Sequence, residues 1–265
     1  MNPFDNPDLI KIMLAEPTAG VIDSIAHDNR LDAYMDYAWL EARSKFKFFT
    51  GNVGRCMVHY AREMIAEEAM HQKMDYVFMI DDDMIIPKHC FERLYESMKK
   101  ENADMAAPMC TQRYAPFYPV IYKQTLRVID GVNHIDNQFV EDYEPNSTLT
   151  VDGFGFGVAL ISVPFLRKMK KVMPDGMFFS NRYVGEDIWF CMMARQKLDA
   201  KIIVDTSIKV GHLRHPEIAT EYDYVKSKNL HEKFKSVYGH LNGSTLDSKT
   251  VYSDITKDAK NENVV

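Results

Sequence analysis

The 265-residue sequence lacks three features that would place it in large classes of protein. Its four cysteines stand singly and form no CxxC pair, so they indicate neither a zinc site nor a disulfide framework. No apolar run approaches the ~20 residues that span a bilayer, and residues 1–5 do not resemble a signal peptide. The net charge of −6 argues against broad nucleic-acid binding. We therefore expect a soluble protein of the cytoplasm.

Apolar segments of strand length alternate along the chain with segments of helical periodicity. The 46% hydrophobic content is that of a globular protein. The expected strands are 8–14, 48–50, 76–80, 104–107, 158–163, 201–205 and 208–212, and the expected helices are 31–46, 54–74, 88–100, 164–171, 188–198 and 222–238. This alternation predicts an α/β fold with a mostly parallel central sheet flanked by helices.

The middle of the chain departs from this pattern. Residues 111–119 are rich in aromatic residues and proline, and residues 126–139 read as a hairpin with Asp130-Gly131 at its turn. We expect one catalytic domain over residues 1–238, with a nucleotide-binding half at 8–110 and an acceptor half at 111–238. Residues 239–265 are polar and are expected to form a flexible tail.

The most informative stretch is the apolar run 76–80 followed by Asp81, Asp82 and Asp83, here called the acidic triplet. Ligand crevices of α/β sheets lie at the carboxyl ends of strands. Adjacent carboxylates repel one another unless a cation lies among them. In an extended chain Asp81 and Asp83 project to one side, which suits Mg²⁺ or Mn²⁺. A helix cap or a solvated turn would also explain the triplet, although Pro87 places the next helix start beyond it.

Other candidate site residues each have a structural alternative. Arg62, on or beside the apolar stripe of its helix, could bind a phosphate or base, or it could reach solvent or pair with a glutamate. Asp187 could be a general base or could only favour the helix macrodipole. His212 could bind a metal or could be a satisfied histidine at a strand end. The glycines at 153, 155 and 157 indicate a close backbone approach but form no dinucleotide fingerprint.

Taken together, these motifs resemble the GT-A class of nucleotide-sugar glycosyltransferases, and family 2 in particular. The matching elements, in chain order, are the loop Glu16-Pro17-Thr18, Ala61-Arg62-Glu63, the acidic triplet, the glycine run 153–157, Glu186-Asp187 and Gly211-His212. Two positions depart from the family pattern. The first loop lacks the common aromatic-Asn ending, and Glu63 stands where asparagine often follows the arginine.

The resemblance implies roles for the acidic and histidine residues. Asp83 would coordinate Mn²⁺ or Mg²⁺, Asp81 would assist the metal or bind the donor ribose, and His212 would be the histidine ligand near the diphosphate. Asp187 would be the general base that takes the proton of the acceptor hydroxyl. This set implies an inverting glycosyltransferase, while a retaining enzyme on the same fold would not need Asp187 as base.

The resemblance also implies a donor pocket for a uridine or guanosine diphosphate sugar. Its residues would be Pro17, Thr18, Arg62, Asp81, Asp82 and Gly155. Two alternatives stand beside this interpretation: a metal-dependent nucleotidyltransferase or phosphatase, and a non-catalytic protein that binds sugar nucleotides or glycans. A dehalogenase-type phosphatase would carry DxDx[TV] after its first strand, whereas Met84-Ile85 follows this triplet. A binding module would not need Asp187.

Overall fold

The structure is a computed structural model that describes residues 6–18, 20, 22–129, 132–179, 184–214 and 217–238. The chain divides into two compact units, Met1–Val225 and Lys226–Val265. The first unit contains the sheet and every predicted site residue. The predicted tail 239–265 lies outside the described residues.

A seven-stranded sheet forms the centre of the first unit, in the order β2-β1-β3-β10-β5-β11-β8. The strands are β1 (Ile10–Thr18), β2 (Phe46–Gly54), β3 (Tyr76–Ile80), β5 (Met105–Met109), β8 (Thr148–Val151), β10 (Val158–Ser162) and β11 (Ile202–Lys209). β1 pairs in parallel with β2 and β3, and β5 with β11, while β10 and β8 run against their neighbours. The predicted α/β fold with a mostly parallel sheet is confirmed.

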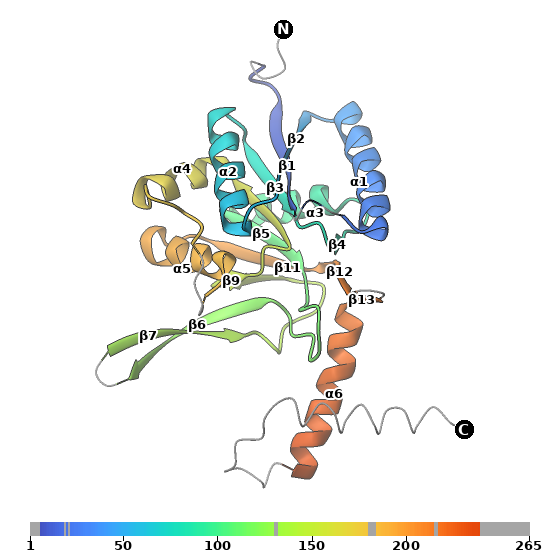
Figure 1. Cartoon of the computed structure of the whole chain (residues 1–265), viewed down its shortest axis with the longest axis vertical. Helices are drawn as coiled ribbons and strands as arrows, with labels where there is room; N and C mark the ends of the chain where they lie inside the picture. Colours follow the sequence, from blue (N-terminus) through green and yellow to red (C-terminus); the bar gives the residue numbers. More distant parts are fainter. Residues whose placement is uncertain are drawn as a thin grey trace. The chain divides into compact units, whose positions relative to one another are not determined.

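Helices cover both faces of this sheet. They are α1 (Ser24–Arg43), α2 (Val58–His71), α3 (Cys90–Glu101), α4 (Val163–Val172) and α5 (Glu186–Leu198). Figure 1 shows α2, α4 and α5 together on one side and α1 on the other. Successive strand residues point to opposite faces: on β3, Val77 and Met79 join the core under α2, α4 and α5, whereas Phe78 and Ile80 join the core under α1 and α3.

The core under α1 and α3 is an aromatic cluster. The Phe91 ring lies 5.0 to 5.5 Å from those of Phe46, Phe48 and Phe78, all at steep angles. Edge-to-face geometry of this kind adds about 0.5–1.5 kcal/mol per pair to the burial of the rings. This cluster fixes β3, and with it the start of the acidic triplet, against the helices behind it.

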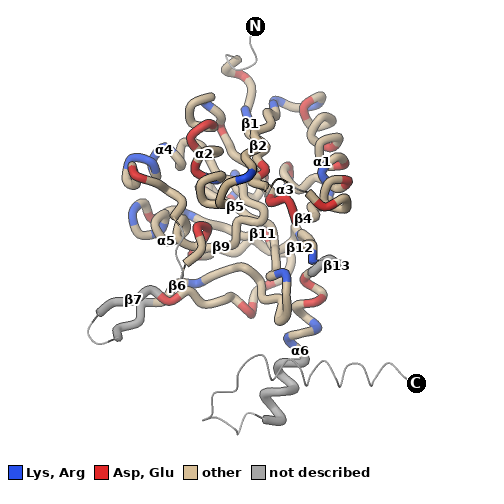
Figure 2. The backbone as a smooth tube through the Cα atoms, viewed as in Figure 1, with Lys and Arg blue, Asp and Glu red and all other residues tan. Residues whose placement is uncertain are grey.

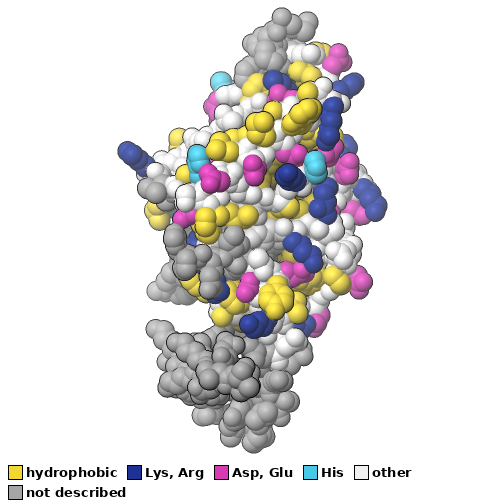
Figure 3. Space-filling model, turned by 90° about the vertical axis from the view of Figure 1, so that its right-hand side faces the viewer, with side chains coloured by type: hydrophobic (Ala, Val, Ile, Leu, Met, Phe, Trp, Pro, Cys, Tyr) yellow, Lys and Arg dark blue, Asp and Glu magenta, His cyan; other side chains and the backbone are white. Residues whose placement is uncertain are grey.

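The first two helices, α1 and α2, both form where their apolar periodicity predicts them, but their apolar residues do not all face the core. In α1, Leu31 and Met35 are 50% and 64% exposed while Arg30 is buried. In α2, Met57, Val58 and Met64 are exposed as well. Hydrophobic periodicity assumes that apolar residues mark the buried side. Figure 3 shows apolar side chains at the surface of the face on which α1 lies.

Two small three-stranded sheets lie beside the main one. The first, β13-β12-β4, joins β4 (Met84–Ile85), β12 (Gly211–Arg214) and β13 (Glu217–Ala219), and it pairs His212 with Met84. The second, β7-β6-β9, contains β6 (Ile121–Ile129), β7 (Val132–Phe139) and β9 (Gly153–Phe154). β6 and β7 form the expected hairpin, which starts at residue 121 rather than 126. α6 (Glu221–Tyr238) follows β13. Within the described part of the chain, no helix is long and apolar enough to cross a membrane.

Candidate active site

The acidic triplet is the turn between β3 and β4. The Asp81 N–H donates to Gly157 O at 2.8 Å, and the Met84 N–H donates to Asp81 O at 3.2 Å. The alternative that the triplet caps a helix is wrong, because α3 begins at Cys90 with His89 at its cap position. The β4–β12 pairing places Gly211 opposite Ile85, and the Leu213 N–H donates to Asp83 O at 2.8 Å. Segments far apart in the sequence are thereby held at this turn.

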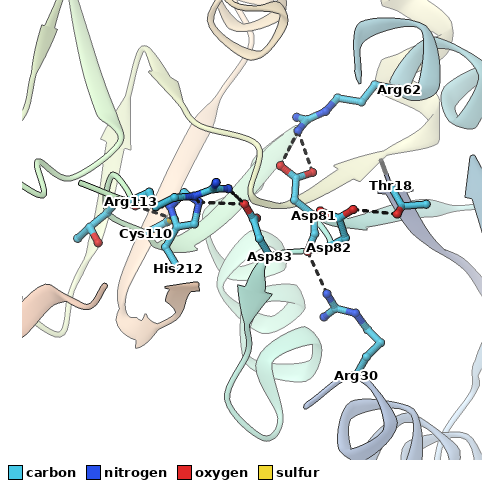
Figure 4. Close-up of polar contacts among 10 residues, drawn as sticks. Thr18, Arg30, Arg62, Asp81, Asp82, Asp83, Cys110, Arg113 and His212 are labelled. Atoms are coloured by element: carbon cyan, nitrogen blue, oxygen red, sulfur yellow. Dashed lines mark hydrogen bonds and ion pairs between the residues drawn. The ribbon is translucent and has the colours of Figure 1, made fainter. Parts of the chain in front are cut away.

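Each carboxylate of the triplet points to a different partner (Figure 4). Asp81 accepts from Arg62 Nη2 through both oxygens, at 2.9 and 2.8 Å. Asp82 Oδ2 accepts from Thr18 Oγ1 at 2.8 Å. Asp83 Oδ2 contacts Arg113 Nη2 and lies 3.3 Å from His212 Nε2. Asp81 and Asp83 thus have separate partners in this arrangement, and their shared binding of one cation stays a prediction.

Arg62 connects the acidic triplet to the start of α5. Its side chain is 3% exposed and lies over the Phe156 ring, 5.3 Å from the centroid. Besides Asp81, its Nε lies 3.5 Å from Glu186 Oε1. Its Nη1 is buried with no hydrogen-bond partner among the described residues. A buried cation with an unsatisfied donor is costly unless a ligand or water completes it. Arg62 does not reach solvent and pairs with a glutamate, as one of the structural alternatives expected, and its binding of a donor phosphate stays a prediction.

Asp187 lies in the first turn of α5. Its Oδ1 accepts the Ile188 N–H at 2.7 Å. Burial raises the pKa of Asp187 above its ordinary value, and Glu186 adds to the rise, while Arg62 and backbone N–H groups oppose it. A Cβ added at Gly155 would lie 3.6 Å from Asp187 Oδ2, so the glycine run leaves room beside this carboxylate. Figure 2 shows acidic positions both before β4 and at the start of α5.

His212 has its ring nitrogens directed to different groups. Nδ1 lies 2.9 Å from Thr111 O, a contact in which only the nitrogen can donate. Nε2 is then an acceptor in the neutral ring, consistent with Arg113 Nε at 3.4 Å, and it faces Asp83. Burial lowers the pKa of His212, with Arg113 acting in the same direction. The neutral imidazole thus presents a lone pair beside a carboxylate oxygen.

The pair of Asp83 and His212 fits a divalent cation completed by substrate oxygens. Mg²⁺ and similar ions are often held by one or two protein side chains together with phosphates. The Arg113 guanidinium already bridges these two residues and shows that a cation is accommodated there. Across the described ranges, no three His, Cys, Asp or Glu residues are grouped closely enough to form a complete metal site. Asp81 is engaged by Arg62 instead.

Two hollows share Thr18 as a lining residue, and one of them is also lined by the acidic triplet. One of about 270 Å³ is lined by Pro17, Thr18, Cys56, Val58, Ala61 and the triplet. The other, of about 340 Å³, is lined by Glu16, Thr18, Gly20, Ile22, His27, Arg30, Leu31, Tyr34 and Asn52. Together they have the volume of a small-molecule site. Pro17 and Thr18 line these hollows, whereas Gly155 lies against Asp187 and not in either hollow. Their part in donor binding stays a prediction.

Two site arginines were not identified from the sequence. Arg30 is buried, its Nη2 donates to Asp81 O at 3.0 Å, and its Nε lies 3.3 Å from Glu16 Oε1. Arg30 precedes Ala33 by three positions and Tyr37 by seven, so the three residues share one face of α1, and this face is buried. Recognising that face as the buried one would have identified Arg30 from the sequence. Arg113 has no such signal, because its loop follows no periodic pattern.

The mixed α/β sheet that ends in this acidic turn is the GT-A glycosyltransferase fold. The sequence profile described as glycosyl transferase family 2 matches residues 21–160, which are 140 of the 265 residues. The chain belongs to glycosyl transferase family 2.

Among solved structures, A197 from STIV has a TM-score of 0.50 at 17% identity, over 77% of this chain and 86% of that one. S. aureus TarS 1–349, solved in complex with UDP-GlcNAc, has a TM-score of 0.42 at 11% identity, over 91% and 69%. The likeness to A197 concerns the fold alone. No curated protein matches the sequence.

Proposed function

We propose that this glycosyltransferase moves a sugar from a nucleoside-diphosphate donor to an acceptor hydroxyl with inversion at the anomeric carbon. The observation that carries the proposal is the position of Arg62, which contacts Asp81 at 2.8 Å and Glu186 at 3.5 Å. It ties the acidic triplet to the helix start that carries Asp187. The acidic triplet and the half-buried Asp187 carboxylate are thereby linked through one residue, which supports a donor and a base on the two sides of the anomeric carbon.

The donor side of the site would be built from the triplet and the hollows around Thr18. Asp83 and His212 would hold Mn²⁺ or Mg²⁺, which when bound neutralises charge on the departing diphosphate. Thr18 and Asp82 are hydrogen-bonded to each other at 2.8 Å; Thr18 lines both hollows, and Asp82 lines the smaller one. The larger hollow would take the nucleoside of a uridine or guanosine diphosphate sugar.

Asp187 would act as the general base. The acceptor O–H gives its proton to the Asp187 carboxylate, the acceptor oxygen bonds to the anomeric carbon, and the bond to the diphosphate oxygen breaks. Burial raises the pKa of Asp187 and so increases its proton affinity, while the positive charge of Arg62 opposes this rise. The backbone N–H of Ile188 fixes the direction of the carboxylate.

The test is turnover by the full chain with a panel of UDP- and GDP-sugars and Mn²⁺, read as release of nucleoside diphosphate. Asp187→Asn should lower kcat by about 10²-fold or more and leave donor affinity within a few-fold, because Asn keeps the shape but accepts no proton. Asp199→Asn, at the exposed end of the same helix, is the control and should match wild type.

Near-normal turnover in folded Asp187→Asn protein would reject the base and favour a retaining mechanism. Binding of a sugar nucleotide without release of diphosphate, with every acceptor class tried, would identify a non-catalytic binding protein.

A further inference from the structure

Arg113 lies on the two side chains that would hold the metal. Its Nη2 pairs with Asp83 Oδ2, and its Nε lies 3.4 Å from His212 Nε2. It belongs to the loop after β5, whose base is closed by the Thr111–Pro119 bridge and by the Gln112 N–H donating to Tyr118 O at 2.9 Å. Figure 4 shows its guanidinium reaching across His212 to Asp83, on the opposite side of the triplet from Arg62.

A guanidinium and a divalent cation cannot use this pair of residues together. Both would need the same Asp83 oxygen and the same His212 nitrogen, and their like charges would repel within a few ångströms. The other two carboxylates of the triplet offer no equivalent place, since Asp81 binds Arg62 and Asp82 binds Thr18.

We propose that Arg113 is a tethered cation that holds Asp83 and His212 before the donor arrives and sets the affinity of the site for divalent cations. The inference rests on the proposed function, because it takes Asp83 and His212 as the metal position. Arg113 neutralises Asp83 in the donor-free protein, and the metal with its diphosphate must displace it. Arg113 therefore sets a threshold of metal concentration below which it occupies Asp83 and His212 and the metal-bound donor does not bind.

The exchange requires a movement of the side chain and not of the loop. The Arg113 side chain is 39% exposed, so it can turn into solvent. The loop base is held independently: His212 Nδ1 donates to Thr111 O at 2.9 Å, and Arg214 lies over the Phe117 ring, 4.9 Å from its centroid. The same imidazole thus anchors the loop through one nitrogen and faces Arg113 through the other.

The experiment is titration of the full chain with Mn²⁺ alone, followed by electron paramagnetic resonance of the free ion. Arg113→Ala should bind Mn²⁺ at least about tenfold more tightly than wild type, since one positive charge a few ångströms from the ion is removed. Arg113→Lys keeps the positive charge but loses the planar set of guanidinium donors, so its Mn²⁺ affinity should lie between those of wild type and Arg113→Ala. Arg43→Ala removes a charge that pairs with Glu92 and should leave Mn²⁺ affinity unchanged.

Asp83→Asn in both backgrounds separates this inference from the proposed function. If Asp83→Asn removes Mn²⁺ binding while Arg113→Ala leaves it unchanged or weakens it, the tethered-cation role is wrong and the metal site stands. If Asp83→Asn has no effect on Mn²⁺ binding in either background, the metal site itself is wrong.

A parallel titration with UDP and GDP tests the opposite role for Arg113. If Arg113→Ala abolishes metal-independent binding of the diphosphates and Mn²⁺ does not restore it, Arg113 itself binds the diphosphate, and the proposal is overturned. Thermal unfolding without metal checks that the variant is folded. With Mn²⁺ the melting temperature of Arg113→Ala should rise more than that of wild type, because the tighter ligand stabilises the folded state more.

Discussion

Asp81 is bound by two buried arginines, one from each side of the sheet. Arg62 in α2 binds its carboxylate and Arg30 in α1 binds its carbonyl oxygen. Removing one partner of a buried charge pair lowers stability by far more than the pair contributes, because the remaining charge is buried without compensation. Asp81 is therefore fixed in place, and Asp83 is the carboxylate of the triplet for which we propose a metal.

The pH dependence of stability should report the ionisation of Asp187. Burial raises its pKa above the ordinary value of 3.8. The folded protein then holds the proton more tightly than the unfolded one, so the ionised carboxylate lowers the unfolding free energy above the folded pKa. This loss is recovered as the pH falls toward the unfolded value. Asp187→Asn, which cannot ionise, should gain stability over wild type near neutral pH, and the gain should shrink near pH 4.

Urea unfolding of both proteins at the two pH values measures this difference. In the catalysed reaction, kcat/KM of wild type should rise with pH through the same raised pKa, and the residual rate of Asp187→Asn should lack that rise. An equal stability difference at both pH values would mean that the carboxyl group does not titrate differently in the folded protein.

At the scale of elements, α2 holds both ends of the site with adjacent residues. Arg62 donates hydrogen bonds to Asp81 of the acidic triplet. Glu63 Oε2 accepts hydrogen bonds from the backbone N–H groups of Met177 and Phe178 at 2.7 and 3.0 Å. The Phe178 ring stacks on Phe190 of α5 at 4.5 Å. Glu63, where the family pattern often has asparagine, thus positions the segment that precedes α5.

Glu63→Ala should lower the unfolding free energy by about 1–3 kcal/mol, because two N–H groups lose their acceptor at a position where the glutamate is mostly buried. Glu63→Gln keeps an acceptor oxygen and should lose less. Urea unfolding gives the free energies, with Glu67→Ala as control, since Glu67 shares Lys170 but is half-exposed. Equal losses in Glu63→Ala and Glu67→Ala would mean that only the Lys170 pair matters.

What the sequence could predict depended on how local each signal was. The strand 76–80, the triplet after it and the α/β alternation follow from short-range patterns, and all are in the structure. The buried side of α1 could not be identified from hydrophobicity. Leu31, Met35 and Trp39 form an apolar stripe that is 50% to 69% exposed, whereas Arg30 is buried. The contact of Arg113 with Asp83 joins residues 30 apart through a loop of irregular structure, which no periodicity encodes.

At the scale of the whole first unit, the sheet separates two cores that must both form. Phe91 is central to the aromatic core under α1 and α3, and it is fully buried. Phe91→Ala should lower the unfolding free energy by about 3–5 kcal/mol, the usual loss for a large cavity in a packed core. Phe179→Ala, at a position that is 49% exposed, should cost much less.

Chemical unfolding followed by fluorescence and by far-UV circular dichroism measures both variants. Coincident transitions would show that the two cores unfold together. A loss below about 1 kcal/mol in Phe91→Ala would mean that the cluster repacks around the missing ring.

The β6–β7 hairpin is joined to the main body near its base. β9 pairs with it only at Ile121–Phe154 and Tyr122–Gly153, while farther out the ladder from Leu126–Ile135 to Ile129–Val132 pairs the two strands with each other (Figure 1). Opening of the outer rungs breaks no bond of the main sheet, so their amide protons should exchange with solvent sooner than those of β3. For protein engineering, the outer part of the hairpin is therefore a place where the chain can be lengthened or shortened without breaking a bond of the main sheet.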